Sequence, residues 1–168
     1  MVIERNKYLQ ELVSCRHNGL VKIITGMRRC GKSFLLFRLF RRFLEDNGVA
    51  NDHIVEMAFD DYAFKEFRNP DKFYAYVKGR IIDDQPYYIL LDEVQMLDEF
   101  EDVLNGLLHI PNADVYVTGS NAKFLSKDII TEFRGRGYQI HVSPLSFAEF
   151  MSVYEGDRED GWNEYLLY

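Results

Sequence analysis

One eight-residue segment constrains the fold of this chain more than any other: it reads Gly26-Met27-Arg28-Arg29-Cys30-Gly31-Lys32-Ser33 and fits the pattern G-x-x-x-x-G-K-[ST]. It follows the apolar segment 20–25, which predicts a strand, and it opens the segment 32–47, whose apolar residues recur at helical spacing. Glycines let such a loop curl until successive backbone N–H groups point at one anion, which also faces the positive end of the helix. The segment therefore predicts a phosphate-binding loop.

The residue types in this loop suit a nucleoside triphosphate. Lys32 supplies a point charge for the β- and γ-phosphates, and Ser33 offers a hydroxyl to Mg²⁺, which prefers oxygen ligands. Arg28 and Arg29 either contact phosphates or partners or are solvated loop cations, and Cys30 is interpreted as a small filler rather than a nucleophile. The predicted nucleotide-binding residues are Gly26, Met27, Arg28, Arg29, Cys30, Gly31, Lys32, Ser33 and Phe34.

Along the rest of the chain, strand-like and helix-like segments alternate, which is typical of a parallel sheet covered by helices. A length of 168 residues suits one such domain. The predicted strands are 20–25, 53–59, 87–91, 115–118 and 138–142, and the predicted helices are 3–15, 32–47, one from 70, 98–109 and one from 146. The last helix begins with a Ser-x-x-Glu capping box, Ser146 to Glu149. The sequence therefore predicts one α/β domain with about five strands.

Two acids follow the strand 87–91, which is apolar on both faces and so belongs in the middle of a sheet. Ligands of parallel sheets gather at the carboxyl ends of strands, where Ser33 and Asp92 would both lie. Asp92 is predicted to hold Mg²⁺, and Glu93 to orient or deprotonate the water that attacks the γ-phosphate. The alternative is a pair of solvated acids. Gln95 and the acids after it are interpreted as a solvated helix start.

Further polar residues follow the next strand and precede the last one. Ser120 and Asn121 could sense the γ-phosphate or hold the attacking water, or could simply cap a helix. Arg134 and Arg136 could reach a nucleotide, either in cis or across a subunit boundary, or could be surface loop residues.

The charge distribution agrees with an anion site in the first third of the chain. The net charge is -7, which disfavours nucleic-acid binding through overall basicity, yet residues 1–50 contain ten Lys and Arg against four Asp and Glu. Arg38, Arg41 and Arg42 are interpreted as a solvated helix face, with DNA contact as the alternative. Two cysteines, scattered histidines and a polar start predict a cytoplasmic protein without a disulfide framework, zinc site or signal peptide. No apolar stretch approaches the roughly 20 residues that cross a bilayer.

Taken together, the segments GMRRCGKS, YYILLDEVQ, VYVTGSNAKFLS, FRGR and VSPLSFAEF resemble a family of bacterial and archaeal AAA-superfamily ATPases, whose ATPase module is followed by a C-terminal region with nuclease-like features. The resemblance implies a three-layer P-loop fold with an additional strand, in the order 5-1-4-3-2, so that the strand carrying Thr118 lies between those carrying the loop and Asp92. It implies ATP and Mg²⁺ as ligands. It also implies that Ser120 or Asn121 is the sensor, that Arg134 or Arg136 is an arginine finger, and that Arg5 and Tyr8 approach the adenine.

The same resemblance bears on domain organisation, because members of the family look about twice as long as this chain. We therefore expect an ATPase domain over residues 1–150 and the start of a truncated C-terminal region over 151–168. The expected function is an ATPase module whose hydrolysis drives a conformational change in an attached domain. Expected partners are ATP, further copies that supply an arginine in trans, and DNA through the missing region.

Two other functions remain open on the sequence alone. One is a nucleotide-dependent switch or scaffold with little turnover, and the other is a small-molecule phosphotransferase, which would need an acceptor pocket in place of the Asp92-Glu93 pair. A GTPase is disfavoured because the one Asn-Lys pair, Asn6-Lys7, lacks the Asp that would read guanine.

Overall fold

The computed structural model describes residues 2–120, 133 and 135–167. Five parallel strands form one sheet in the order β2-β3-β4-β1-β5. The strands are β1 Val21–Thr25, β2 Ile54–Ala58, β3 Tyr87–Asp92, β4 Ala113–Thr118 and β5 Gly137–His141. Read from the other edge, this is the predicted order 5-1-4-3-2. The strand that carries Thr118 therefore lies between the strands that lead to the loop and to Asp92, as expected.

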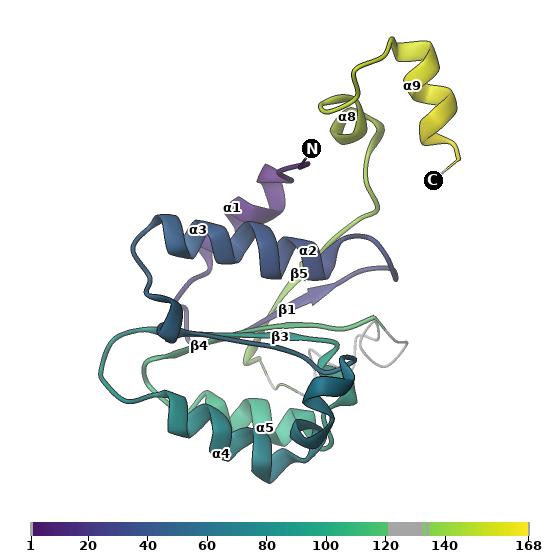
Figure 1. The fold of residues 1–168 in the computed structure, drawn as a ribbon. Helices are drawn as coiled ribbons and strands as arrows, with labels where there is room; N and C mark the ends of the chain where they lie inside the picture. The colour runs from purple at the N-terminus through teal and green to yellow at the C-terminus, as the bar shows by residue number, and fades with distance from the viewer. Residues whose placement is uncertain (1, 121–132, 134, 168) are drawn as a thin grey trace.

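Helices cover both faces of the sheet and complete three layers (Figure 1). One face carries α1 Asn6–Ser14, α2 Lys32–Phe34, the π-helical η1 Leu35–Phe40 and α3 Arg41–Asp46, and the other carries α4 Pro70–Arg80 and α5 Phe100–Leu107. Alternate strand residues serve the two cores, since Ile23 packs with the α4 and α5 side and Ile24 with the α1 to α3 side. The predicted α/β class is confirmed.

Local sequence explains where several helices begin. Asn69 caps α4 by accepting a hydrogen bond from the backbone N–H of Lys72, and Pro70 occupies the first helical position.

The predicted helix 32–47 is present, but its middle turns are π-helical. The short 3₁₀ helices η2 Asn51–His53, η3 Tyr62–Arg68 and η4 Val94–Met96 were not expected. Such segments lack the 3.6-residue repeat on which helix prediction depends.

Two helices at the C-terminal end stand apart from the sheet, in yellow-green and yellow in Figure 1. They are α8 Phe147–Met151, which has the predicted capping box, and α9 Arg158–Tyr165. They pack through aromatic rings, such as Phe147 against Trp162 with 4.9 Å between ring centroids. Within the described residues, no helix is both long and apolar enough to span a bilayer.

A buried ion pair joins β1 and β4 near their amino ends. Lys22 is fully buried and its ammonium bonds to the carboxylate of Asp114, which is 4% exposed. Asp114 also accepts hydrogen bonds from the hydroxyl of Tyr116 at 2.8 Å and from the backbone N–H of His17 at 3.1 Å. These bonds compensate for the burial of two charges.

Candidate functional site

The predicted phosphate loop connects β1 to α2 and depends on two glycines with positive φ angles. Gly26 has φ 147 and Gly31, which precedes α2, has φ 91. A Cβ atom on Gly26 would lie 2.3 Å from the carbonyl oxygen of Val142, in the segment that follows β5. The backbone N–H of Val142 donates a hydrogen bond to the carbonyl oxygen of Thr25 at 2.8 Å, so the segment after β5 packs directly against the start of the loop. A residue with a side chain does not fit at position 26.

The ammonium of Lys32 lies folded back into the loop. Lys32 is 5% exposed, and its Nζ donates hydrogen bonds to the carbonyl oxygens of Gly26 at 3.1 Å and Met27 at 2.8 Å. Both described oxygen partners are neutral, although a buried charge is stabilised most by an opposite charge. The buried Lys32 ammonium therefore favours the binding of an anion, such as a phosphate group, in the loop.

Ser33 and Asp92, the predicted metal-binding pair, are in contact. The Ser33 hydroxyl lies 2.8 Å from both carboxylate oxygens of Asp92, at the end of β3. Burial raises the pKa of the Asp92 carboxyl, and hydrogen bonds from Thr118 and Ser33 only partly oppose this effect. A cation here would favour the ionised form. One hydroxyl and one carboxylate fit Mg²⁺, which keeps water and phosphate oxygens as its other ligands.

Glu93 is held beside this pair by both its backbone and its side chain. It adopts a left-handed conformation with φ 51, and its N–H donates to the Thr118 hydroxyl at 3.1 Å. The Thr118 hydroxyl in turn donates to Asp92. The Glu93 carboxylate accepts hydrogen bonds from the Ser120 hydroxyl, at 2.9 and 3.0 Å, and from the Gln95 amide. Thr118 thus holds Asp92 and Glu93 next to the end of β4 through hydrogen bonds.

Glu93 and Ser120 line an open cavity of about 380 Å³ at the carboxyl ends of the strands. Its lining comprises Arg28 of the loop, Met96 of η4, and Asp60, Glu93 and Ser120, which follow β2, β3 and β4. The guanidinium of Arg28 therefore shares one cavity with the acids Asp60 and Glu93 and with the Ser120 hydroxyl. This placement fits the rule that ligands of parallel sheets bind at the carboxyl edge.

Residues 18–151 match a protein family described as AAA domain. The chain belongs to this family. An uncharacterized protein of Haemophilus influenzae is 32% identical over 159 residues, which cover 94% of this chain and 40% of that protein. An uncharacterized protein of Methanocaldococcus jannaschii is 27% identical over 135 residues, which cover 78% of this chain and 28% of that protein. The chain spans less than half the length of these two relatives.

Solved structures with low sequence identity share the fold of this AAA domain. A DNA polymerase III gamma subunit-related protein of Thermotoga maritima has a TM-score of 0.61 at 14% identity, over 94% of this chain and 51% of that one. AMPPCP-bound DnaA of Aquifex aeolicus has a TM-score of 0.56 at 17% identity, over 96% and 54%. The ORC1 protein of Aeropyrum pernix in complex with DNA has a TM-score of 0.57 at 14% identity, over 95% and 49%.

The AAA domain brings most of the predicted site residues to one edge of the sheet. Lys32, Ser33, Asp92, Glu93 and Ser120 are linked through the loop and the contacts above. Cys30 of the loop is buried, whereas Met27 of the loop and Phe34 of α2 are 63% and 41% exposed. The predicted sensor Asn121 and finger candidate Arg134 lie outside the described residues.

Arg136, a predicted arginine finger, lies at the opposite edge of the sheet from the phosphate loop of its own subunit, which disfavours its predicted role in cis. Its carbonyl accepts a hydrogen bond from Val21 at 2.8 Å, at the amino end of β1, and Gly137 pairs with Val21 in the sheet. Gly26 follows the other end of β1, about 16 Å away at 3.3 Å per residue. The parallel direction of the strands therefore separates Arg136 from the loop. The predicted role across a subunit boundary stays a prediction.

Sequence reasoning missed three contributors to the site. Gln95 was assigned to a solvated helix start, but its amide bonds to Glu93. Thr118 was placed on the strand between those that carry the loop and Asp92, but its hydrogen bonds to Asp92 and Glu93 were not predicted. Asp60 lies two residues beyond β2, and the rule applied to Asp92, that acids at carboxyl ends of strands share one edge, would have identified it.

Proposed function

We propose that this AAA domain binds ATP with Mg²⁺ and hydrolyses it, and that hydrolysis changes the conformation of a region attached to the domain. One observation carries the proposal: a chain of hydrogen bonds links Ser33 of the loop to Asp92, Asp92 to Thr118, and Thr118 to Glu93. A simple anion site would need the loop but not the two acids.

Binding would begin with the triphosphate in the loop. Backbone N–H groups and the N-terminal end of α2 favour an anion there, and Lys32 would exchange its carbonyl partners for the β- and γ-phosphate oxygens. Mg²⁺, held by Ser33 and by Asp92 directly or through water, would neutralise charge on the phosphate oxygens.

Glu93 would then activate the attacking water. The water oxygen bonds to the γ-phosphorus, its proton passes to the Glu93 carboxylate, and the bond to the leaving oxygen of ADP breaks, which releases ADP and inorganic phosphate. Ser120 and Gln95 fix the direction of the carboxylate through their hydrogen bonds, so the base is oriented before the substrate arrives.

Replacing Glu93 with Gln tests this assignment. The Glu93→Gln variant should bind ATP as the parent does but release phosphate about 100-fold more slowly, because only the proton acceptor is lost. Isothermal titration measures the binding and a multiple-turnover phosphate assay measures the rate. Glu99→Gln is the matched control, since Glu99 is also a glutamate with a left-handed backbone, φ 50, but is exposed and starts α5.

Unchanged phosphate release in Glu93→Gln would remove the proposed base. Equal loss in Glu93→Gln and Glu99→Gln would show that charge or folding, rather than water activation, explains the effect. Absence of ATP binding by the parent would overturn the whole proposal.

A nucleotide-dependent switch with little turnover is the second candidate function. The observation that favours it is the position of Arg136 at the opposite edge, because an arginine near the γ-phosphate accelerates hydrolysis strongly. A single subunit would then bind ATP and hydrolyse it slowly. A small-molecule phosphotransferase would need an acceptor pocket in place of the Asp92-Glu93 pair, and it is disfavoured because both acids are present beside the loop.

DNA contact is proposed only for the attached region. Within the basic first third, Arg41 bonds to Glu45 and Glu56, and Arg42 lies 3.6 Å from Asp46. These pairs support the solvated-face interpretation of α3 and leave fewer free cations for phosphates. The ORC1 structure that shares the fold contains DNA, which makes DNA a reasonable probe for a longer chain.

A further inference from the structure

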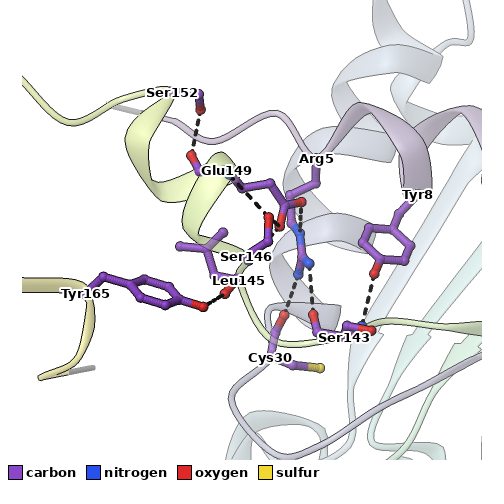
Figure 2. Close-up of polar contacts among 9 residues, drawn as sticks. All are labelled: Arg5, Tyr8, Cys30, Ser143, Leu145, Ser146, Glu149, Ser152 and Tyr165. Carbon is purple, nitrogen blue, oxygen red and sulfur yellow. Dashed lines mark hydrogen bonds and ion pairs between the residues drawn. The ribbon is translucent and has the colours of Figure 1, made fainter. Parts of the chain in front are cut away.

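The guanidinium of Arg5 joins the phosphate loop to the C-terminal helices (Figure 2). Its Nη1 donates to the carbonyl oxygen of Cys30 in the loop at 2.7 Å. Its Nη2 donates to the carbonyl of Ser143, in the segment after β5, at 2.8 Å, and its Nε donates to the carboxylate of Glu149 in α8 at 3.1 Å. One side chain thus contacts the loop, the segment after β5 and α8, all of which are far from Arg5 in sequence.

The Arg5 side chain is buried and packs against the ring of Tyr8. It is 6% exposed, and the guanidinium carbon lies 4.7 Å from the centroid of the Tyr8 ring. The Tyr8 hydroxyl accepts a hydrogen bond from the N–H of Ser143 at 3.1 Å, which fixes the ring. The backbone of Arg5 is left-handed, with φ 43, an unfavourable conformation for a residue with a side chain.

The contact with Cys30 orients a donor in the phosphate loop. The described peptide bonds are all trans, so the C=O of Cys30 and the N–H of Gly31 point in opposite directions within one plane. When Arg5 holds the carbonyl on one side, the Gly31 N–H is held on the other, at the start of α2. A charged partner on the carbonyl makes this bond stronger than a neutral one.

The contact with Glu149 reaches α8 at its capping box. One carboxylate oxygen of Glu149 accepts from Arg5, and the other accepts from the backbone N–H of Ser146 at 2.8 Å. The chain of contacts continues to α9, because the Tyr165 hydroxyl donates to the carbonyl of Leu145 at 2.6 Å (Figure 2). The Glu149 carboxylate therefore caps the N-terminus of α8 and also binds α8 to the rest of the domain through Arg5.

We infer that Arg5 is a positioning residue that couples nucleotide binding at the phosphate loop to the docking of α8. The inference rests on the proposed function, and it names the connection through which the site would act on an attached region. A phosphate bound to the Gly31 N–H stabilises the peptide orientation that Arg5 prefers, so Arg5 stays in place to hold Glu149. Coupling is reciprocal, so docking of α8 must also favour nucleotide binding.

Two measurements on the same variants test the coupling. Isothermal titration gives the affinity for ATP with Mg²⁺, and hydrogen exchange gives the protection of backbone amides at the end of α8 with and without ATP. In the parent, ATP should slow exchange in α8. In Arg5→Ala, ATP should bind about tenfold more weakly, and saturating ATP should no longer slow that exchange.

A double-mutant cycle separates coupling from a merely structural role. If Arg5 acts through Glu149, the Arg5→Ala/Glu149→Ala double variant should lose no more ATP affinity than Arg5→Ala alone. Ser146→Ala is the matched control for α8, because it weakens the capping box but leaves the ion pair, so ATP should still slow exchange. Arg42→Ala is the control for loss of a positive charge and should behave as the parent.

Should Arg5→Ala fail to fold by circular dichroism, Arg5→Lys takes its place. Lysine keeps the charge but cannot reach three acceptors in fixed directions, so it should lose the response of α8 to ATP as well. Additive losses in the cycle, or an unchanged response of α8 in both Arg5 variants, would overturn the inference while ATP binding by the parent upheld the proposed function. A parent that bound no ATP would overturn the proposed function first.

Discussion

Gly26 shows how one residue can be fixed by three constraints at once. Its φ angle of 147 is unfavourable for residues with a side chain, a Cβ atom would lie 2.3 Å from the Val142 carbonyl oxygen, and the same atom would lie 2.8 Å from the Cys30 sulfur. Real Cβ atoms do not approach other heavy atoms so closely, so the backbone would have to move. The backbone that moves belongs to the loop and to the segment beneath it.

Replacing Gly26 with Ala should therefore lower the free energy of unfolding by about 1–3 kcal/mol and abolish ATP binding, because the loop opens. Gly48→Ala is the matched control, since Gly48 also has a positive φ, 85, but nothing lies within 4 Å of a Cβ there. Gly48→Ala should lower the free energy of unfolding by about 1 kcal/mol and leave ATP binding intact. Thermal denaturation and ATP titration measure the two effects. Identical behaviour of the two variants would contradict the collision argument.

At the scale of strands, one end of the sheet carries residues of the candidate site and the other carries a buried ion pair. The carboxyl ends of β3 and β4 carry Asp92 and Thr118, which face the loop. The second residues of β1 and β4, Lys22 and Asp114, form the buried ion pair at the opposite end. The pair contributes nothing to the candidate site, so its effect on stability can be measured separately from nucleotide binding.

Replacing Asp114 with Ala should lower the free energy of unfolding by about 3–5 kcal/mol, because the Lys22 ammonium would be left buried without a counter-charge. Chemical denaturation measures the loss, and ATP affinity below the unfolding transition should match that of the parent. Arg42→Ala removes an exposed pair with Asp46 and should change the stability by less than about 1 kcal/mol. A small effect of Asp114→Ala would mean that water reaches Lys22.

These elements also show what the sequence could and could not predict. Strand β3 was predictable because its residues are apolar on both faces, and the loop because its glycines and Lys32 have fixed spacing. Lys22 was not recognised as buried, since a charged residue in a strand ordinarily faces water and its partner is 92 residues away. Helix α9 was missed because its one described buried residue is Gly161, so it has no apolar stripe.

At the scale of the whole molecule, the part of the chain that the structure describes does not bring the candidate finger Arg136 to the site of its own subunit. Arg28 lines the cavity, but Arg136 lies at the opposite edge of the sheet from the loop. Subunits arranged head to tail could place that edge of one copy against the cavity of the next, which a single chain cannot do. The rate of hydrolysis should therefore depend on assembly, whereas ATP binding by one subunit should not.

Phosphate release per subunit should rise with protein concentration, by up to about 10³-fold if an arginine acts in trans. The sharpest test mixes two inactive variants, Lys32→Ala, which cannot bind ATP, and Arg134→Ala/Arg136→Ala, which binds ATP but lacks both candidate fingers. Each alone should be slow, and the mixture should recover activity, because an intact Lys32 site can receive an arginine from a Lys32→Ala neighbour. A Lys32→Ala/Arg134→Ala/Arg136→Ala triple variant is the control and should rescue nothing. A constant rate per subunit, together with no recovery in the mixture, would exclude an arginine in trans and leave the slow switch as the better description of this AAA domain.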